Sequence, residues 1–225
     1  MKKDNSIKNS LHPRAWLSYS AMKMWELNPE EFKLKYFRPD QYIQRTNRGQ
    51  SLGKEVADAL ENDVETGNIE IDIILAQITP KLPRRDEKIF TKLSIGKYPN
   101  RGFVPILVKP DRCSMDYMDF QEVKTGSGPW TQKKVDEDDQ MLFYFTGLYL
   151  KNRDNKHGGI VIPKGKLIWA PTEKRIDDDG VERPHLVGDV REFPTTRTFV
   201  QLLQMMSRMS KAWREIGVAM ENEII

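Results

Sequence analysis

The sequence predicts an α/β domain in which helices flank a small central mixed β-sheet. Helical periodicity marks the N-terminal third, strand-like segments follow in the middle, and a long amphipathic helix closes the chain. The resulting order of helices, strands, a helix, strands and a final helix favours one α/β domain. With 225 residues, of which 38% are hydrophobic and 31% charged, the chain can form a real core under a charged surface.

Two short helices are predicted near the N-terminus. Ser18 or Ser20 is expected to cap the first, within residues 17–27, because a serine hydroxyl there can accept a free backbone N–H. The second covers residues 28–37 and has Pro29 near its first position. The residues before these helices carry charge but no apolar stretch. We therefore expect a flexible arm over residues 1–14 and a single domain over residues 15–225.

The remaining elements follow from the same rules. Helices are predicted over 51–62, 135–150 and 195–216, and strands over 87–95, 103–108, 115–123, 166–170 and 189–193. Residues 69–78 fit a helix or a strand, because they alternate first and then run apolar. In the final helix the predicted buried stripe consists of Phe199, Leu202, Leu203, Met206, Met209, Trp213 and Ile216.

Composition excludes several classes of protein. Cys113 is the single cysteine, so there is no disulfide framework and no cysteine-rich metal cluster, which fits a reducing cytoplasm. We interpret it as a small buried residue. No apolar run reaches the length of a membrane span, so we expect a cytoplasmic protein without a membrane partner. The net charge of +3 is compatible with nucleic acid without arguing for it.

Glu122 and Lys124 stand at the end of a buried-looking strand. Side chains alternate along a strand, so these two share one face. If the strands 103–108 and 115–123 pair as a hairpin, Asp111 converges with Glu122 at one rim of the sheet. Two carboxylates repel unless a cation lies between them, and oxygen ligands suit Mg²⁺ or Mn²⁺. A nearby lysine can orient water or stabilise phosphoryl charge. The alternative is an ordinary solvated ion pair.

Four segments in order resemble the PD-(D/E)xK nuclease superfamily, in particular its RecB-like and phage exonuclease branch. In chain order they are "LSYSAMKMWELNPEEFKLKYF" at 17–37, Pro110-Asp111, the run Glu122-Val123-Lys124-Thr125-Gly126, and the pair Gln140 and Tyr144. The resemblance implies a restriction-endonuclease-like core. It also implies a metal held by Asp111, Glu122 and the Val123 carbonyl, with Lys124 acting on water or charge. Gln140 and Tyr144 would lie beside this site.

The sequence departs from that family pattern in two places. A histidine usually follows the glycine that Gly53 represents, and Ala57 stands there instead. Glu61, one helical turn further on, is our candidate for that metal ligand, with an ordinary surface acid as the alternative. Members with an iron–sulphur cluster have a cysteine where Asn28 stands, and no cysteine follows Cys113 here. We therefore expect no iron–sulphur cluster.

Several further residues are candidates for DNA contact. Lys133 and Lys134 lie in a basic cluster that can neutralise phosphates, and Trp130 follows a glycine-rich loop and can stack on an unpaired base. Ser18 and Ser20 belong to the motif that opens the family resemblance. For the lysines the alternative is a plain solvated surface, and for Trp130 a place in the core or in a lid.

These observations together predict a Mg²⁺- or Mn²⁺-dependent deoxyribonuclease. By resemblance we expect an exonuclease acting on DNA ends or on junctions of single and double strands, in recombination, repair or phage DNA metabolism. Its setting would be a bacterial or phage-infected cell. A structure-specific endonuclease, a catalytically silent DNA-binding accessory protein and an α/β scaffold for a protein partner are the alternatives. A recombination partner protein and self-association are left open.

Overall fold

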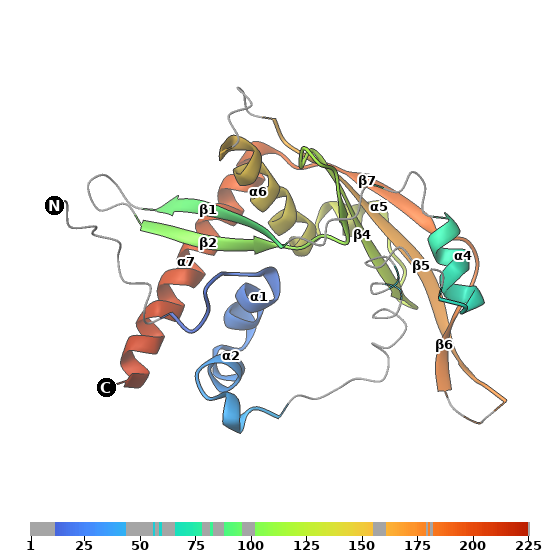
Figure 1. Ribbon diagram of the computed structural model, residues 1–225, viewed down its shortest axis with the longest axis horizontal. Coiled ribbons are helices and arrows are strands. Elements are labelled where there is room, and N and C mark those ends of the chain that lie inside the picture. The colour runs from blue at the N-terminus through green and yellow to red at the C-terminus, as the bar shows by residue number, and fades with distance from the viewer. Residues whose placement is uncertain are drawn as a thin grey trace.

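The computed structural model describes residues 12–43, 56, 59, 66–77, 82, 88–95, 102–154, 161–178, 180 and 182–224. Its helices are α1 (Tyr19–Leu27), α2 (Pro29–Tyr36), the 3₁₀ turn η2 (Pro39–Gln41), α4 (Ile69–Gln77), α5 (Gln132–Asp136), α6 (Asp139–Asp154) and α7 (Phe199–Ile224). Its strands are β1 (Ile89–Ile95), β2 (Gly102–Val108), β3 (Arg112–Cys113), β4 (Asp119–Gly126), β5 (Lys164–Ile176), β6 (Glu182–Leu186) and β7 (Arg191–Thr195). Figure 1 shows their arrangement.

The main sheet is mixed. Its strands follow the order β3-β4-β5-β6, and β7 also pairs with β5. β4 and β5 run parallel, with α6 in the connection between them, whereas the other pairs are antiparallel. β1 and β2 form a separate antiparallel pair. This arrangement confirms the predicted mixed sheet, and β4, between β3 and β5, carries the motif that the sequence singled out.

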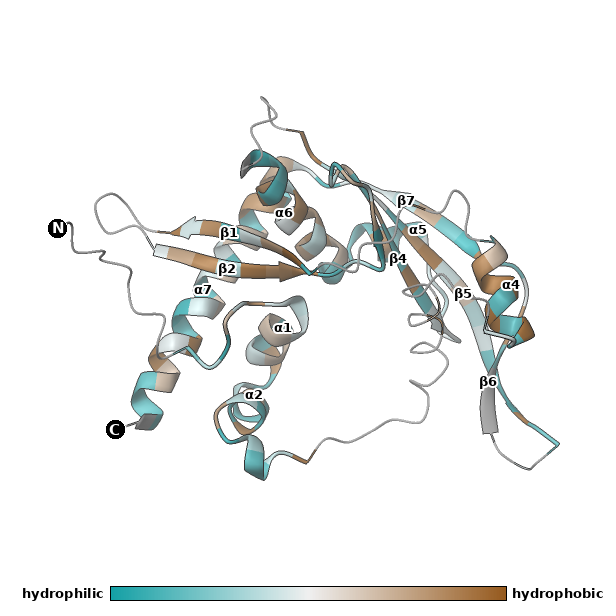
Figure 2. Ribbon diagram, in the orientation of Figure 1, coloured by the Kyte–Doolittle hydropathy of each residue, from teal (hydrophilic) through white to brown (hydrophobic). Residues whose placement is uncertain are grey.

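Helices pack on both faces of the main sheet (Figures 1 and 2). The larger core joins β4 and β5 to α6, α7, α1 and the inner face of β1 and β2, and its largest buried side chains include Phe120, Phe143 and Phe145. A smaller core on the opposite face packs Ile71 and Ile74 of α4 against Ile168 of β5. A mixed sheet flanked by helices was the predicted fold class, and it is confirmed.

Local capping signals place the helices as predicted. The Ser18 hydroxyl accepts the N–H of Ala21, so Ser18 rather than Ser20 caps α1. Asn28 caps α2 and Pro29 is its first residue. Residues 69–77 are the helix α4, where the Asn68 side chain accepts the N–H of Glu70.

The predicted helix over 135–150 is two helices. α5 ends at Asp136, and α6 begins at Asp139 after a break. The cause is the carboxylate of Asp138, which accepts the N–H of Met141 over 2.8 Å and so caps a new helix. The acidic residues at this point therefore separate two helices.

The predicted hairpin between strands 103–108 and 115–123 is wrong in its first strand. Residues 103–108 lie in β2, which pairs with β1, and the partner of β4 is the two-residue strand β3. The second strand begins only at Asp119. Before it, the hydroxyl of Ser114 accepts the N–H groups of Met118 and Asp119, and Tyr117 adopts a φ of 62°, so these residues form a turn.

Two other expectations need correction, and a third lies largely outside the described residues. The strand predicted over 166–170 extends over the whole of β5, and β6, which pairs with its second half, was not predicted. In α7 the predicted buried stripe is correct at Leu202, Met209, Trp213 and Ile216. Leu203 is 48% exposed, and Met205 is buried in this turn whereas the predicted Met206 is half-buried. Residues 1–11 of the predicted arm and most of the predicted helix 51–62 lie outside the described residues.

Residues 12–14 are described and make contacts. The His12 ring stacks on Trp213 of α7 with centroids 3.4 Å apart, and Arg14 donates to the hydroxyl of Tyr36 over 2.7 Å. Among the described helices, none combines the length and the apolar character that crossing a membrane requires.

Candidate active site

The hairpin of β3 and β4 places Asp111 opposite Glu122. Arg112 pairs with Gln121, so the register one residue earlier sets Asp111 against Glu122. The Asp111 carboxylate accepts the backbone N–H of Val123 over 2.7 Å. The convergence of these two carboxylates was predicted from the sequence, although the strand that delivers Asp111 is β3 rather than the longer strand before it.

Glu122 and Lys124 share the face of β4 that is turned toward α6. Glu122 is only 4% exposed, and the ammonium of Lys124 lies 2.7 Å from its Oε1. A carboxyl group as buried as that of Glu122 needs further polar partners, since desolvation costs more than one contact returns. Those partners come from the neighbouring helix.

Gln140, in the first turn of α6, connects the strand to the helix. Its Oε1 accepts from Lys124 Nζ over 2.9 Å, and its Nε2 donates to Glu122 Oε1 over 2.7 Å. The same amide nitrogen lies 2.8 Å from the hydroxyl of Tyr144, one turn further along. The structure thus brings Glu122, Lys124, Gln140 and Tyr144 into one hydrogen-bonded network.

The network shifts the pKa of each of its titratable members. Burial, helped by the negative charge of Asp111, raises the pKa of Glu122 to about 8 against the opposing pull of Lys124. Burial alone would lower the pKa of Lys124, but the neighbouring Glu122 carboxylate outweighs it and the pKa is raised. Burial also raises the pKa of Tyr144 well above its ordinary value. Lys124 is therefore an ammonium at neutral pH.

The carboxylates fit a hard divalent cation. Glu122 Oε2 is buried and has no hydrogen-bond partner among the described residues, although it lies on the same rim as Asp111. A buried oxygen without a donor is costly, and a cation would compensate it. The described residues contain no cluster of three or more metal-binding side chains, so Asp111 and Glu122 would supply only part of the ligands of such an ion. Glu61 lies outside the described residues, and its role and that of the Val123 carbonyl stay predictions.

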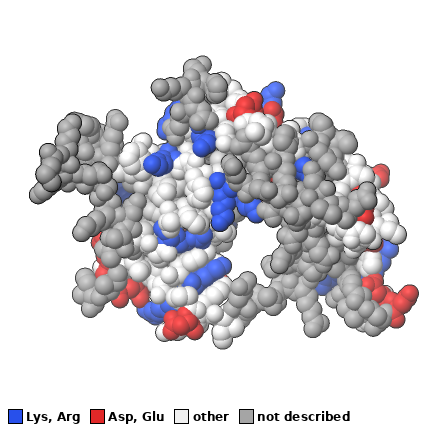
Figure 3. Space-filling model, viewed as in Figure 1, with Lys and Arg blue, Asp and Glu red and all other residues white. Residues whose placement is uncertain are grey.

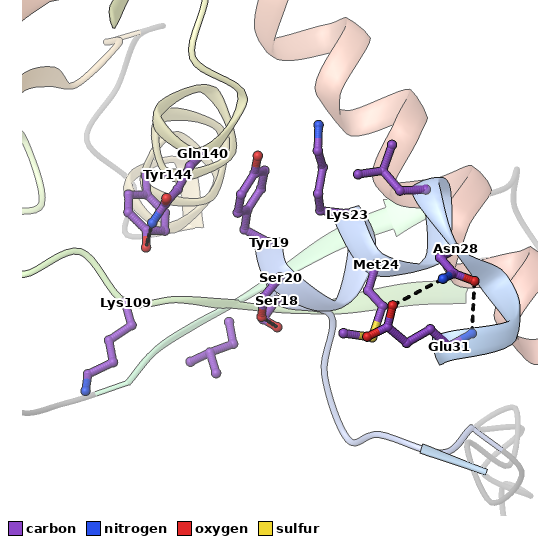
Figure 4. A pocket seen from close by; sticks show the side chains of 12 residues that line it. Ser18, Tyr19, Ser20, Lys23, Met24, Asn28, Glu31, Lys109, Gln140 and Tyr144 are labelled. Atoms are coloured by element: carbon purple, nitrogen blue, oxygen red, sulfur yellow. Dashed lines mark hydrogen bonds between the residues drawn. The ribbon is translucent and has the colours of Figure 1, made fainter. Parts of the chain in front are cut away.

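A cleft of about 670 Å³ opens beside the network (Figure 4). Gln140 and Tyr144 line its inner end, and α1 supplies the opposite wall. Ser18 and Ser20 face this space, with their hydroxyl oxygens 3.3 Å apart. The full lining is Ser18, Tyr19, Ser20, Lys23, Met24, Leu27, Asn28, Glu31, Leu107, Lys109, Gln140 and Tyr144.

The other predicted DNA contacts lie at a second hollow. Lys133 and Lys134 of α5 line a space of about 410 Å³, together with Tyr19 and Lys23, which also line the first cleft. The ammonium of Lys134 sits 4.3 Å from the centre of the half-buried Trp130 ring. Acidic side chains share this hollow, so it is less basic than the sequence cluster suggested.

Sequence reasoning missed two lysines at the first cleft. Lys109 directly precedes Pro110-Asp111, so its closeness to the metal motif was a usable signal. Lys23 follows Ser20 by three residues on one helix, which places both on one face. On this side of the molecule, Lys and Arg gather over α1, α2 and the end of β2, whereas Asp and Glu lie toward the margins (Figure 3).

Comparison with known proteins shows the fold and little more. No family model matches the sequence, and no curated protein matches it. The chain is similar to the crystal structure of a "putative exonuclease" from Eubacterium rectale, with a TM-score of 0.51 and 11% sequence identity over 100% of this chain and 88% of that one. At this identity the likeness concerns the fold, so the chain has a mixed α/β fold that it shares with a protein named as a nuclease.

Proposed function

We propose that this protein is a metal-dependent DNA nuclease with a PD-(D/E)xK site of the RecB-like type. The observation that carries the proposal is the juxtaposition of Asp111, Glu122 and Lys124, with the unpartnered Glu122 Oε2 at its centre. The fold neighbour named as a putative exonuclease supports an exonuclease that acts on DNA ends. The basic side chains around the cleft support a polyanionic substrate.

Mg²⁺ or Mn²⁺ is the proposed cofactor, held by Asp111 and Glu122. Such an ion would polarise the phosphoryl group and make a bound water a nucleophile near neutral pH. Asp111 is held in place by the Val123 N–H, which fixes one of its oxygens and limits how its carboxylate turns. The position of this ligand therefore depends on the backbone of β4.

Lys124 is the proposed catalytic cation. Its raised pKa keeps it protonated, which suits stabilisation of phosphoryl charge better than removal of a proton from water. Gln140 is a positioning residue, because it contacts both Lys124 and Glu122 and fixes their orientation. Through Tyr144 and Gln140 the network reaches the cleft, where we place the substrate.

Digestion of end-labelled linear DNA tests this function. Single- and double-stranded substrates are incubated beside a closed circle with Mg²⁺, Mn²⁺ or EDTA. The matched control for Lys124→Ala is Lys166→Ala, because Lys166 on β5 makes an ion pair of the same 2.7 Å length, to Glu192 outside the network. We expect loss of linear DNA but not of the closed circle. EDTA and Lys124→Ala should abolish this loss, and Lys166→Ala should not.

Two results would redirect the proposal. Nicking of the closed circle would indicate the structure-specific endonuclease. DNA binding without cleavage in any lane, by a folded protein, would indicate the silent accessory protein.

A further inference from the structure

The pair β1 and β2 has one buried face and one exposed face. The buried side chains of β1 and β2 pack against α6 and α7, and β1 and β2 lie in front of α7 in Figure 1. On the opposite face, Phe90 is 46% exposed and Phe103 is 50% exposed. Two large rings on a two-stranded sheet face are costly in water, so they point to a binding role.

Trp16, which is half-buried, borders this exposed face. Leu17 adds to the edge of β2, since its N–H donates to Pro105 O over 2.8 Å and its carbonyl accepts from Leu107 over 2.9 Å. Next to it, the Trp16 ring meets Phe90 edge-on with centroids 5.4 Å apart. Three aromatic rings therefore lie on or beside this face of the two strands. We call the surface formed by Trp16, Phe90 and Phe103, together with Lys88 and Lys92 beside them, the aromatic face.

Lysines stand beside the rings. Lys88 Nζ lies 5.5 Å from the centre of the Trp16 ring, and Lys92 Nζ lies 5.8 Å from that of Phe103. Residues 88–95 and 102–109 contain three lysines, the third being Lys109, and neither aspartate nor glutamate. Alternating rings and cations without acids complement a chain that has flat apolar groups and regularly spaced negative charges.

The aromatic face leads into the cleft. Leu107 pairs with Phe90 across the two strands, and the same Leu107 lines the cleft together with Lys109 and Gln140. From Phe103 to Lys109 the strand spans roughly 20 Å, at about 3.3 Å per residue. A DNA strand lying along this face would thus reach the network that holds Glu122.

We propose that the aromatic face binds single-stranded DNA and guides it into the cleft. Rings can stack only on bases whose faces are free, whereas a duplex offers its backbone and groove edges. The inference rests on the proposed function in taking the cleft as the place of cleavage. The binding itself does not depend on cleavage.

Binding of fluorescent oligo(dT) in EDTA tests this inference, because cleavage is then suppressed. The oligonucleotide is longer than the roughly 16 nucleotides that a single-strand-binding fold covers at most. Phe90→Ala and Phe103→Ala are each expected to raise Kd about five-fold or more, the effect of losing one stacking ring. Leu203→Ala is the control, since Leu203 is 48% exposed, as much as the two Phe rings, but lies on α7 and does not line the cleft. Lys92→Glu should weaken binding more than Lys211→Glu on α7, in a salt-dependent way.

Three outcomes would overturn the inference. The first is unchanged oligo(dT) affinity in the two Phe variants. The second is an equal loss of affinity for blunt duplex DNA. The third is a change of oligomeric state in those variants without a change in binding, which would make the face a protein contact. A protein that binds through these rings yet never cleaves DNA would contradict the proposed function and leave this inference standing.

Discussion

The side-chain amide of Gln140 on α6 donates to Oε1 of Glu122 on β4 over 2.7 Å. Lys124 donates to the same oxygen, which leaves Oε2 of Glu122 as the oxygen without a donor among the described residues. Helix and strand together therefore decide which oxygen of Glu122 is left without a donor. In the proposed site, Gln140 would orient a metal ligand without binding the metal itself.

Gln140→Ala is expected to lower the cleavage rate by about 10- to 100-fold, as loss of a group that orients a metal ligand does. The fold should hold, because Lys124 still pairs with Glu122. Tyr144→Phe, which removes only the hydroxyl bonded to Gln140, should have a smaller effect. Single-turnover rates at saturating DNA make the comparison. A Tyr144→Phe protein as impaired as Gln140→Ala would show that the hydroxyl itself is needed.

Glu122 predicts a pH-dependent stability in the absence of metal. Its pKa is about 8 in the folded protein and 4.5 ordinarily, so between these pH values the folded state keeps a proton that the unfolded state has lost. The free energy of unfolding should fall as pH rises through this range, by up to about 1.4 kcal/mol per pH unit from this group.

Urea unfolding in EDTA at several pH values measures this effect. The Glu122→Gln variant has no titratable group at this position, so it should not lose stability in this way. The unfolding free energy of the variant minus that of the wild type should therefore rise from pH 4.5 to about pH 8. A constant difference across that range would refute the raised pKa.

Two helical glycines predict opposite changes in stability. A Cβ on Gly147 of α6 would lie 2.0 Å from Cγ2 of Val108, so α6 approaches β2 too closely for a side chain. Gly147→Ala should therefore destabilise the protein by about 1–3 kcal/mol, despite the better helix propensity of alanine. Gly217 of α7 has no atom within 4 Å of such a Cβ, so Gly217→Ala should stabilise by up to about 1 kcal/mol. Thermal unfolding compares the two.

His185 on β6 lies between two carboxylates. Its Nδ1 is 2.9 Å from Glu70 of α4 and its Nε2 is 2.6 Å from Asp177. Only the imidazolium can donate to both, and the bond to Glu70, aided by that to Asp177, raises the pKa of His185 above 6.5. The contact therefore contributes stability below pH 6.5 that is lost as pH rises through the raised pKa.

Hydrogen exchange at Leu186 checks this contact, because its N–H donates to Glu70 beside His185. Beyond the intrinsic pH effect on exchange, protection should decrease at alkaline pH in the wild type. His185→Gln should lack this decrease. Equal pH profiles for the two proteins would exclude a charged His185.

Local chemistry made much of the fold predictable. Ser18, Asn28 and Thr198 each accept a backbone N–H at a helix start, and such caps depend on only three or four neighbouring residues. The predictions failed where contacts between residues far apart in the sequence determine the structure. β2 pairs with β1 instead of β4, and no periodicity in either strand specifies its partner.

The candidate site shows the same division. Alternation along β4 placed Glu122 and Lys124 on one face, and helical spacing placed Gln140 below Tyr144. What could not be predicted is that Gln140 contacts both strand residues, since that depends on how α6 crosses β4. The cleft was missed for the same reason: α1 and Lys109 meet only in the folded chain.

The residues of the network and Asp111 all fall within one continuous segment, 111–144, whereas the opposite wall of the cleft comes from α1, far earlier in the chain. Under the proposed function, changes in α1 would alter which substrate enters without touching the reacting groups. Substitutions in this protein should accordingly fall into two sets. Those in α1 would change substrate preference, whereas those in the segment 111–144 would change the rate of the reaction. Exchange of α1 between distant relatives would then transfer preference while leaving the reaction intact.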